Sequence, residues 1–149
     1  MPHFTLQIVA QGPILTAVVA VSEQRAGALS SLNIPIPQPI PIRALVDTGA
    51  SGTCIDPSVL RALALTPTGN TQVTTPTTGN VPVDVDQYDV AIIIPPAGGN
   101  QIPFVLGTIP VICTELLQIQ GYHALIGRDI LAHCIFSYNG SMGLFTLAY

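Results

Sequence analysis

One acidic tripeptide in this sequence has the composition and the setting of a catalytic turn. Asp47-Thr48-Gly49 follows an apolar run at positions 44–46 and precedes the small residues of positions 50–53. A carboxylate on a tight turn after a buried strand is partly withdrawn from water, so it stays charged only where backbone N–H groups or a partner group stabilise it. Gly49 allows the sharp turn, and Thr48 supplies a hydroxyl that can fix it to a group opposite. The tripeptide therefore predicts a site for acid–base chemistry.

A second segment, far along the chain, is an apolar run that ends in glycine. Residues 124–126 are apolar, and they are followed by Gly127, Arg128 and a short helix-like stretch. Together the two segments resemble the retropepsin-like aspartic proteases, in which a strand carrying Asp-Thr/Ser-Gly is held by a later apolar-apolar-Gly strand. The similarity covers roughly residues 42–138. It implies a structural supporting role for Gly127 and Arg128.

The resemblance also implies a fold and a substrate cleft. We expect an all-β, retropepsin-like acid protease fold: a closed, barrel-like subunit with one short C-terminal helix, in a two-fold homodimer. The Thr- and Gly-rich stretch at 74–80 resembles the flap of the family, and the strand that follows it resembles the return strand. Because the implied walls near Cys54, Pro76 and Leu125 are uncharged, apolar substrate residues are expected around the scissile bond. The implied substrate-binding residues are Ala50, Ser51, Cys54, Thr77, Thr78, Gly79, Asn80, His123 and Leu125.

The catalytic tripeptide occurs only once in the chain. None of the other aspartates precedes Thr-Gly or Ser-Gly. In aspartic proteases two carboxylates share one proton: the ionised one takes a proton from water, and the protonated one hydrogen-bonds the scissile carbonyl. One Asp47 cannot fill both roles, so a two-fold dimer should bring two together. We therefore expect a homodimeric aspartic endopeptidase, with Asp47, Thr48 and Gly49 catalytic and with activity favoured at mildly acidic pH.

The resemblance implies further contacts in that dimer. Thr48 should hydrogen-bond across the axis, and the apolar end at 144–149 should interleave with its counterpart in a shared sheet. Where many retroviral enzymes carry an acidic residue, this chain has Ser51. The partner of Arg128 is therefore open between backbone carbonyls and Asp56. A single Gly in the flap stretch predicts a stiffer flap.

Composition sets limits on the class of protein. Of the 149 residues, 48% are hydrophobic and only 8% are charged, with 13 Gly and 14 Pro, which favours one all-β domain over a disordered chain or a charged helical bundle. The net charge of −4 leaves no basic surface for phosphates, so a nucleic-acid partner is not expected. No apolar run is long enough for a membrane helix, and no basic leader precedes the first apolar stretch. We expect a cytoplasmic protein without cofactor or metal, or a domain excised from a larger precursor.

Local patterns predict the elements around the turn. Residues 4–9 and 14–21 read as two strands of an opening hairpin, and residues 22–33 read as a loop. The alternation of Ile and Pro at 34–42 predicts an edge strand or an extended approach, because Pro cannot donate to a sheet. Asp56 before Pro57 predicts a helix cap rather than a catalytic carboxylate. Asn139-Gly140 between apolar runs predicts a late hairpin.

Other functions have weaker support in the sequence. His123, His133 and Cys134 could suggest a metal site or a Cys/His nucleophile, but their spacing fits no zinc pattern. The alternative from another class is a non-catalytic retropepsin-like β-domain that dimerises or binds peptides. A domain that cleaves only its own flanking segments is a third possibility.

Overall fold

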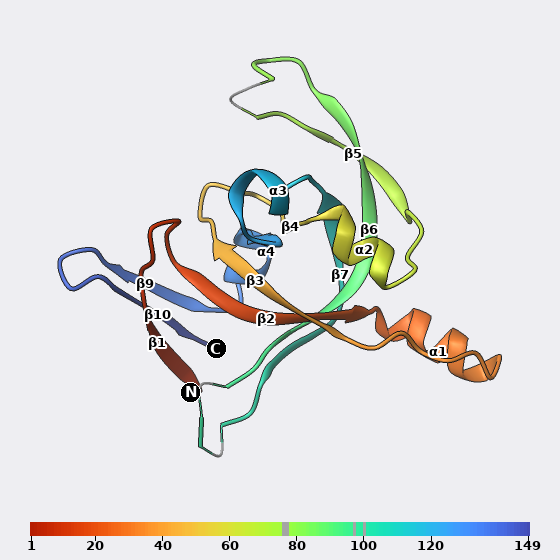
Figure 1. Cartoon of the computed structure of the whole chain (residues 1–149), viewed down its shortest axis with the longest axis horizontal. Helices are drawn as coiled ribbons and strands as arrows, with labels where there is room; N and C mark the ends of the chain where they lie inside the picture. The colour runs from red at the N-terminus through yellow and green to blue at the C-terminus, as the bar shows by residue number, and fades with distance from the viewer. Residues whose placement is uncertain (76–77, 97, 100) are drawn as a thin grey trace.

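The computed structural model describes residues 1–75, 78–96, 98–99 and 101–149. Its body is a closed barrel in the strand order β2-β3-β8-β4-β7-β6, completed by pairing of β6 with β2. The strands are β2 (Ile14–Val21), β3 (Ile40–Val46), β4 (Cys54–Ile55), β6 (Val83–Ile94), β7 (Phe104–Cys113) and β8 (Ala124–Ile126). The mainly β, closed-barrel architecture expected from the sequence is confirmed, and Figure 1 shows the barrel at the centre of the molecule.

Alternation along the strands fills the barrel with aliphatic side chains. In β2, every second residue from Leu15 to Val21 is buried, and in β3 Ile42, Ala44 and Val46 are buried in the same way. Successive side chains of a strand point to opposite faces, so one face of each strand lies in the core. The last of these buried residues, Val46, directly precedes Asp47, and the core therefore anchors the acidic turn.

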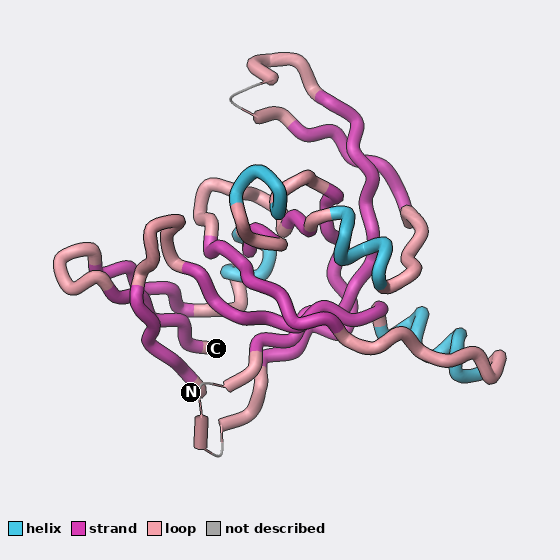
Figure 2. The backbone as a smooth tube through the Cα atoms, in the orientation of Figure 1, coloured by secondary structure: helices cyan, strands magenta, loops and turns pink. Residues whose placement is uncertain are grey.

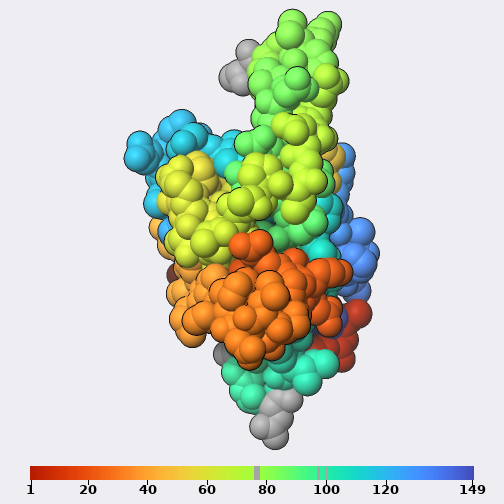
Figure 3. Space-filling view, turned by 90° about the vertical axis from the view of Figure 1, so that its right-hand side faces the viewer, coloured from red at the N-terminus to blue at the C-terminus, as the bar shows by residue number. Residues whose placement is uncertain are grey.

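A long hairpin rises from the barrel. β5 (Gly69–Val73) pairs only with β6, antiparallel, from Gly69 opposite Gln87 to Val73 opposite Val83. Figures 1 and 2 show this hairpin projecting from the top of the barrel, and Figure 3 shows it as a ridge above the body. Pro76 and Thr77, assigned above to the flap stretch, lie outside the described residues.

The strands at the two ends of the chain form a separate three-stranded sheet. Its order is β1 (His3–Gln7), β10 (Leu144–Ala148), β9 (Ile135–Asn139). The predicted opening hairpin is therefore wrong: β1 pairs with β10, and this long-range pairing buries Phe4 beside Phe145 and Leu147. The predicted Asn-Gly hairpin is confirmed, since β9 and β10 pair around the turn at 140–143.

This sheet also changes the interpretation of the C-terminal strand. β10 is the central strand and has β1 on one side and β9 on the other. Its backbone is therefore already paired within one subunit. Interleaving of 144–149 with a partner, as expected above, would require this sheet to open.

The structure contains more helix than the sequence predicted. Residues 22–33, interpreted as a loop, contain α1 (Glu23–Ser31), which begins where Ser22 Oγ accepts a hydrogen bond from Arg25 N at 3.3 Å. No residue of α1 is buried, so its capping and helix-favouring composition outweigh the lack of a hydrophobic face. The short helix expected near the C-terminus is α4 (Arg128–Leu131), and the helix expected after Asp56 is α2 (Pro57–Ala62). The helix α3 (Leu117–Gln120) was not predicted.

Helix α1 and the segment after it form an arm beside the barrel. Figure 1 shows α1 extending to the right of the barrel, and Figure 3 shows it in orange on the face toward the viewer. The Pro-rich stretch 34–39 forms no strand and leads to β3 at Ile40, which confirms the extended approach. In the described ranges the helices are too short or too polar to serve as membrane-spanning segments.

The cap predicted at Asp56 is confirmed, and it joins two helices. Its carboxylate accepts hydrogen bonds from the backbone N–H of Ser58 at 2.9 Å, Leu116 at 2.9 Å and Leu117 at 2.8 Å. Burial alone would raise the pKa of this carboxyl, but the hydrogen bonds from Leu117, Ser58 and Leu116 hold the pKa well below its usual range. Asp56 is only 3% exposed, so it fixes α2 to the segment that opens α3.

Replacing Asp56 by Asn should destabilise the fold by about 2–4 kcal/mol at pH 7, because an amide cannot accept from all these N–H groups. Because the pKa is lower in the folded state, the ionised carboxyl stabilises the fold fully above the unfolded-state pKa of about 3.9. This contribution is lost as the pH falls from that value through the lower pKa of the folded state. Urea unfolding should therefore show that the free energy of unfolding of Asp56→Asn is far below that of wild type at pH 7. At pH 3 the two values should lie closer together. Asp84→Asn, at an exposed carboxylate, serves as the control. Equal midpoints for Asp56→Asn and wild type at pH 7 would contradict this role.

Candidate active site

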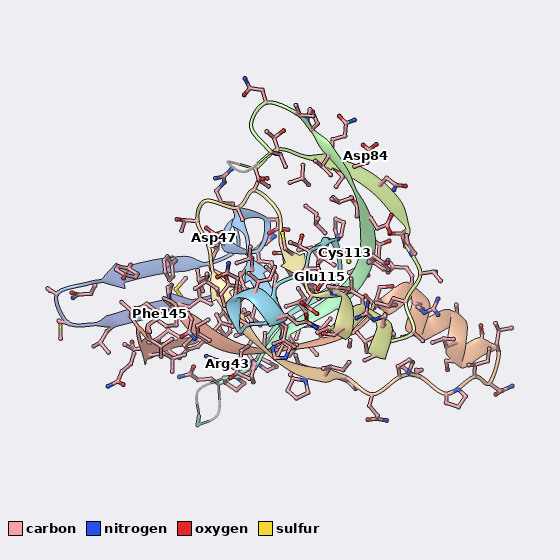
Figure 4. The ribbon with its side chains drawn as sticks, turned by 45° about the horizontal axis from the view of Figure 1, so that its top comes forward. Arg43, Asp47, Asp84, Cys113, Glu115 and Phe145 are labelled. Carbon is pink, nitrogen blue, oxygen red and sulfur yellow. The ribbon has the colours of Figure 1, made fainter. Side chains whose placement is uncertain are left out.

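The turn that carries Asp47 is held by its own backbone and by β8. Asp47 Oδ1 accepts from Gly49 N at 2.8 Å, and Ala50 N donates to Asp47 O at 3.3 Å. Asp47 N donates to Ile126 O at 3.0 Å, which continues the parallel pairing of β3 with β8 by one residue. The carboxylate thus has a defined direction while it stays partly exposed (Figure 4).

Arg128 supports the turn through backbone carbonyls. Its Nη1 donates to Thr48 O at 3.1 Å, and its backbone N donates to Ala50 O at 2.9 Å. Of the two partners left open by the sequence, the structure shows the carbonyls, since Asp56 is engaged with α2 and α3. The start of α4 is therefore bound to both sides of the acidic turn.

Gly127 lies where two backbones nearly touch. A Cβ atom at this position would be 2.6 Å from both C and O of Gly52 and 3.0 Å from Asp129 Oδ1. Its φ of −86° is ordinary for any residue, so the need for glycine comes from the close approach and not from the backbone conformation. The site therefore requires glycine for contact between the end of β8 and the segment at Gly52 that leaves the turn.

A Thr–Asp pair behind the turn was not recognised in the sequence. Thr53 Oγ1 donates to Asp129 Oδ1 at 2.8 Å, Thr53 N donates to Asp129 Oδ2 at 2.9 Å, and Gly127 N donates to Thr53 Oγ1 at 3.1 Å. Thr53 is fully buried, so its hydroxyl needs these partners. The available signal was a hydroxyl residue in an otherwise apolar run at 53–55 and an acidic residue directly after Gly127-Arg128.

The acidic turn opens into a cleft of about 630 Å³ between the barrel and the long hairpin. Asp47 is the only charged residue among those described as lining it. Of the predicted site residues, the structure brings Asp47, Gly49, Ala50, Ser51, Cys54 and Leu125 to this cleft. The lining residues that sequence reasoning missed are Gly52, Thr71, Gln72, Val73, Ile112 and Thr114. Thr74 and Thr75, which also line the cleft, belong to the stretch assigned above to the flap.

The comparison with protein families agrees with this geometry. A family model described as aspartyl protease matches residues 32–106, which is half of the chain and includes the turn with Asp47. The chain belongs to the aspartyl protease family. Among solved structures, the chain is similar to a retropepsin-like aspartic protease from Rickettsia conorii, with a TM-score of 0.59, 15% identity and coverage of 99% of this chain and 90% of that one. This likeness shows a retropepsin-like fold. A search among curated protein sequences gave no match.

Some predicted residues of this aspartyl protease family member lie away from the cleft lining. Thr78, Gly79 and Asn80 are at the turn of the long hairpin and do not line the cleft, and Thr77 is outside the described residues. His123 is also absent from the lining, because its Nδ1 accepts from Arg43 N at 3.2 Å and its backbone N donates to Arg43 O at 2.8 Å. His123 therefore ties β8 to β3 in this subunit.

The turn of the long hairpin is closed by two threonines. Thr75 N donates to Thr78 Oγ1 at 2.8 Å, and Thr78 N donates to Thr75 Oγ1 at 3.2 Å. Hydroxyl groups that bond neighbouring backbone in this way restrict a turn. These bonds therefore link Thr78 to Thr75, which is itself a lining residue of the cleft.

The surroundings of the thiol in the cleft favour its neutral form. Burial raises the pKa of Cys54; its hydrogen bond with Thr114 lowers that pKa, and the charges of Asp129 and Asp47 raise it again. A thiol with a raised pKa is neutral near pH 7 and reacts slowly. Cys54 therefore contributes an apolar wall. Among the residues that the structure describes, no three His, Cys, Asp or Glu side chains come together as a metal site.

Proposed function

We propose that this chain is an aspartic endopeptidase that works as a homodimer, with Asp47 of each subunit forming the catalytic pair. The observation that carries the proposal is a lone carboxylate, held on a rigid turn, at the floor of a cleft with no other charge among its described lining residues. The volume of the cleft is in the range that binds small and peptide-like ligands. Membership in the aspartyl protease family supports the same reaction.

The two carboxylates divide the chemistry between them. Two Asp47 side chains on a symmetry axis share one proton, because like charges that close cannot both ionise. The ionised member removes a proton from a water molecule as that water attacks the scissile carbonyl. The protonated member donates a hydrogen bond to the carbonyl oxygen as negative charge develops there. This division of roles favours activity at mildly acidic pH.

The exposed side of the turn suits a second subunit. Thr48 is exposed, and its carbonyl, not its hydroxyl, is used by Arg128. In the proposed dimer the Thr48 hydroxyl bonds across the axis and fixes the distance between the two acids. The long hairpin acts as a flap that closes over an extended peptide and excludes water.

The walls of the cleft favour apolar side chains around the scissile bond. Ile112, Leu125 and Cys54 form an uncharged surface next to Asp47. A charged substrate side chain would lose hydration there without finding an opposite charge. Peptides with aliphatic or aromatic residues on both sides of the cleaved bond are therefore the expected substrates.

A peptide inhibitor with a statine-type hydroxyl in place of the scissile bond tests the proposal. The hydroxyl mimics the transition state and needs both carboxylates, so we expect it to bind at least about 100-fold more tightly than the same peptide without the hydroxyl. Titration calorimetry should give one inhibitor per two chains, and Asp47→Asn should remove the difference between the two peptides. Equal affinity for both peptides in the wild type would indicate a non-catalytic peptide-binding module.

A further inference from the structure

The Pro-rich stretch 34–39 lies in an exposed part of the chain that carries no charge. Residues 26–42 contain no Asp, Glu, Lys or Arg. Leu32 is 68% exposed, Ile34 48% and Ile36 44%, so three aliphatic side chains lie uncovered within five positions. A run of exposed apolar side chains without charge is suited to contact with another apolar surface.

The two ends of this part of the chain are fixed to the barrel, but the stretch itself is not paired. Near one end, Arg25 Nη2 donates to Ala64 O at 3.1 Å, and at the other end β3 begins at Ile40. Within the described ranges, the backbone N–H groups of Ile36 and Gln38 have no hydrogen-bond partner. Figure 1 shows the stretch leading from the far end of α1 back to β3, outside the barrel. Its free donors are therefore open to a second molecule.

The alternation of proline gives the stretch two different edges. Pro35, Pro37 and Pro39 have no N–H group. In an extended chain, the backbone groups of successive residues point to opposite edges, as the side chains alternate between faces. The N–H groups of Ile36 and Gln38 therefore lie on the same edge. The stretch can pair as a strand along that edge only.

The cleft presents one strand edge to such a segment. In the described part of the chain β5 pairs with β6 alone, so its other edge is open. All five residues from Thr71 to Thr75 line the cleft. Because side chains alternate along a strand, five consecutive residues reach one cleft only where the edge of the strand faces it. An extended segment in the cleft can therefore pair with β5.

Charge and position identify the cleft of a second molecule as the partner of the stretch. Asp47 is the only charged residue among the described lining residues, so a segment without charge enters at the least cost in lost hydration. Among the described lining residues, none comes from 22–39. The stretch therefore does not reach the cleft of its own subunit.

The same prolines make the stretch a poor substrate. Every peptide bond from Ile34 to Ile42 has proline on one side. The proline ring holds φ near −65°, whereas φ in a paired strand is about −120° to −140°. One residue next to the attacked bond is therefore always turned away from strand geometry. A misplacement of the reacting carbonyl by about 1 Å can slow attack by about 100-fold.

We propose that the Pro-rich stretch 34–39 is a pseudosubstrate that enters the cleft of a second molecule, pairs with β5 and competes with substrates. This inference rests on the proposed function, because an occupied cleft lowers activity only where the cleft is the site of hydrolysis. The protein thereby limits its own activity when it is concentrated and recovers that activity on dilution.

A peptide of residues 33–41 with blocked ends tests the contact. It should inhibit hydrolysis of an apolar peptide competitively and remain intact by mass spectrometry. The same peptide with Ile36→Asp should inhibit at least about 10-fold more weakly, because its carboxylate would lose hydration in the cleft. With Pro35→Ala and Pro37→Ala it should become a substrate, because the flanking residues can then adopt strand geometry. Absence of competitive inhibition, or cleavage of the unchanged peptide between residues 34 and 41, would overturn the proposal.

The variant Ile36→Asp tests the same contact in the whole protein. Dimer formation affects wild type and variant alike, so the measure is the ratio of their activities per subunit. This ratio should be about 1 in dilute enzyme and rise to about 3 or more in concentrated enzyme, where the wild type occupies its own clefts. Ile102→Asp, at another exposed isoleucine (69% exposed), should follow wild type at every concentration. A ratio for Ile36→Asp that stays at 1 would overturn the proposal.

The outcomes separate this inference from the proposed function. Hydrolysis of apolar peptides that the 33–41 peptide does not inhibit would overturn the pseudosubstrate and leave the protease proposal intact. Calorimetric binding of the 33–41 peptide, lost with Ile36→Asp, to a protein that hydrolyses no peptide would support the contact with the cleft and contradict the protease.

Discussion

Replacing Asp47 by Asn should lower kcat/KM for peptide hydrolysis by about 10⁴-fold or more. The substitution removes the general base and the general acid together in a homodimer, and each role contributes roughly 10²–10⁴-fold. A loss of about 10⁴-fold corresponds to about 5.4 kcal/mol of transition-state stabilisation. The fold should survive, because the amide oxygen can still accept the hydrogen bond from Gly49 N that Asp47 Oδ1 accepts at 2.8 Å.

The measurement combines activity with structure. Cleavage of an apolar peptide library, circular dichroism and mass in solution should show an inactive protein with wild-type fold and mass. Glu23→Gln makes the same carboxylate-to-amide change at the exposed start of α1, away from the cleft lining, and should keep full activity. Hydrolysis at the wild-type rate by Asp47→Asn would refute the proposed function.

Replacing Gly127 by Ala should damage both stability and activity. The added methyl would lie 2.6 Å from the backbone of Gly52, and two backbones cannot separate as a flexible side chain can. Overpacking of this kind costs about 1–3 kcal/mol or more. If the strand after the turn moves by about 1 Å, Asp47 moves with it, and a misplacement of that size can cost about 100-fold in rate.

Gly27→Ala is the matched control for Gly127→Ala. A Cβ at Gly27 meets nothing within 4 Å, and in the interior of α1 alanine is favoured over glycine by up to about 1 kcal/mol. Urea unfolding and peptide cleavage should therefore show a neutral or stabilised control next to a destabilised, slow Gly127→Ala enzyme. A Gly127→Ala protein with wild-type midpoint and kcat would show that the contact between β8 and Gly52 is not needed.

Features with a local cause could be predicted from the sequence. The acidic turn after 44–46, the cap at Asp56 and the hairpin at Asn139-Gly140 each depend on a few adjacent residues. A cap or a turn satisfies its hydrogen bonds within a few positions, so the sequence contains both partners. The same reasoning failed at α1, where residues interpreted as a loop form a helix that begins at a Ser cap and has no buried residue.

Long-range pairings could not be predicted in the same way. An alternating pattern shows that a strand has one buried face, but it does not show which strand lies beside it. Residues 4–9 fit a hairpin with 14–21 as well as they fit a sheet with the last strand. The structure pairs β1 with β10, where Phe4 is buried near Phe145.

The sequence by itself determined the chemical group and the backbone turn that presents it, because these depend on residue type and on adjacent residues. The supporting role of Gly127 and Arg128 came only from the resemblance to a known family, since their contact with the turn joins residues far apart in the chain. Only the tertiary structure decided what surrounds that group: the Thr53–Asp129 pair behind it, the walls from β5 and β7, and a β10 strand paired on both sides within one subunit. The physical reason is that these contacts join residues tens of positions apart, and their partners are selected by the packing of the whole barrel.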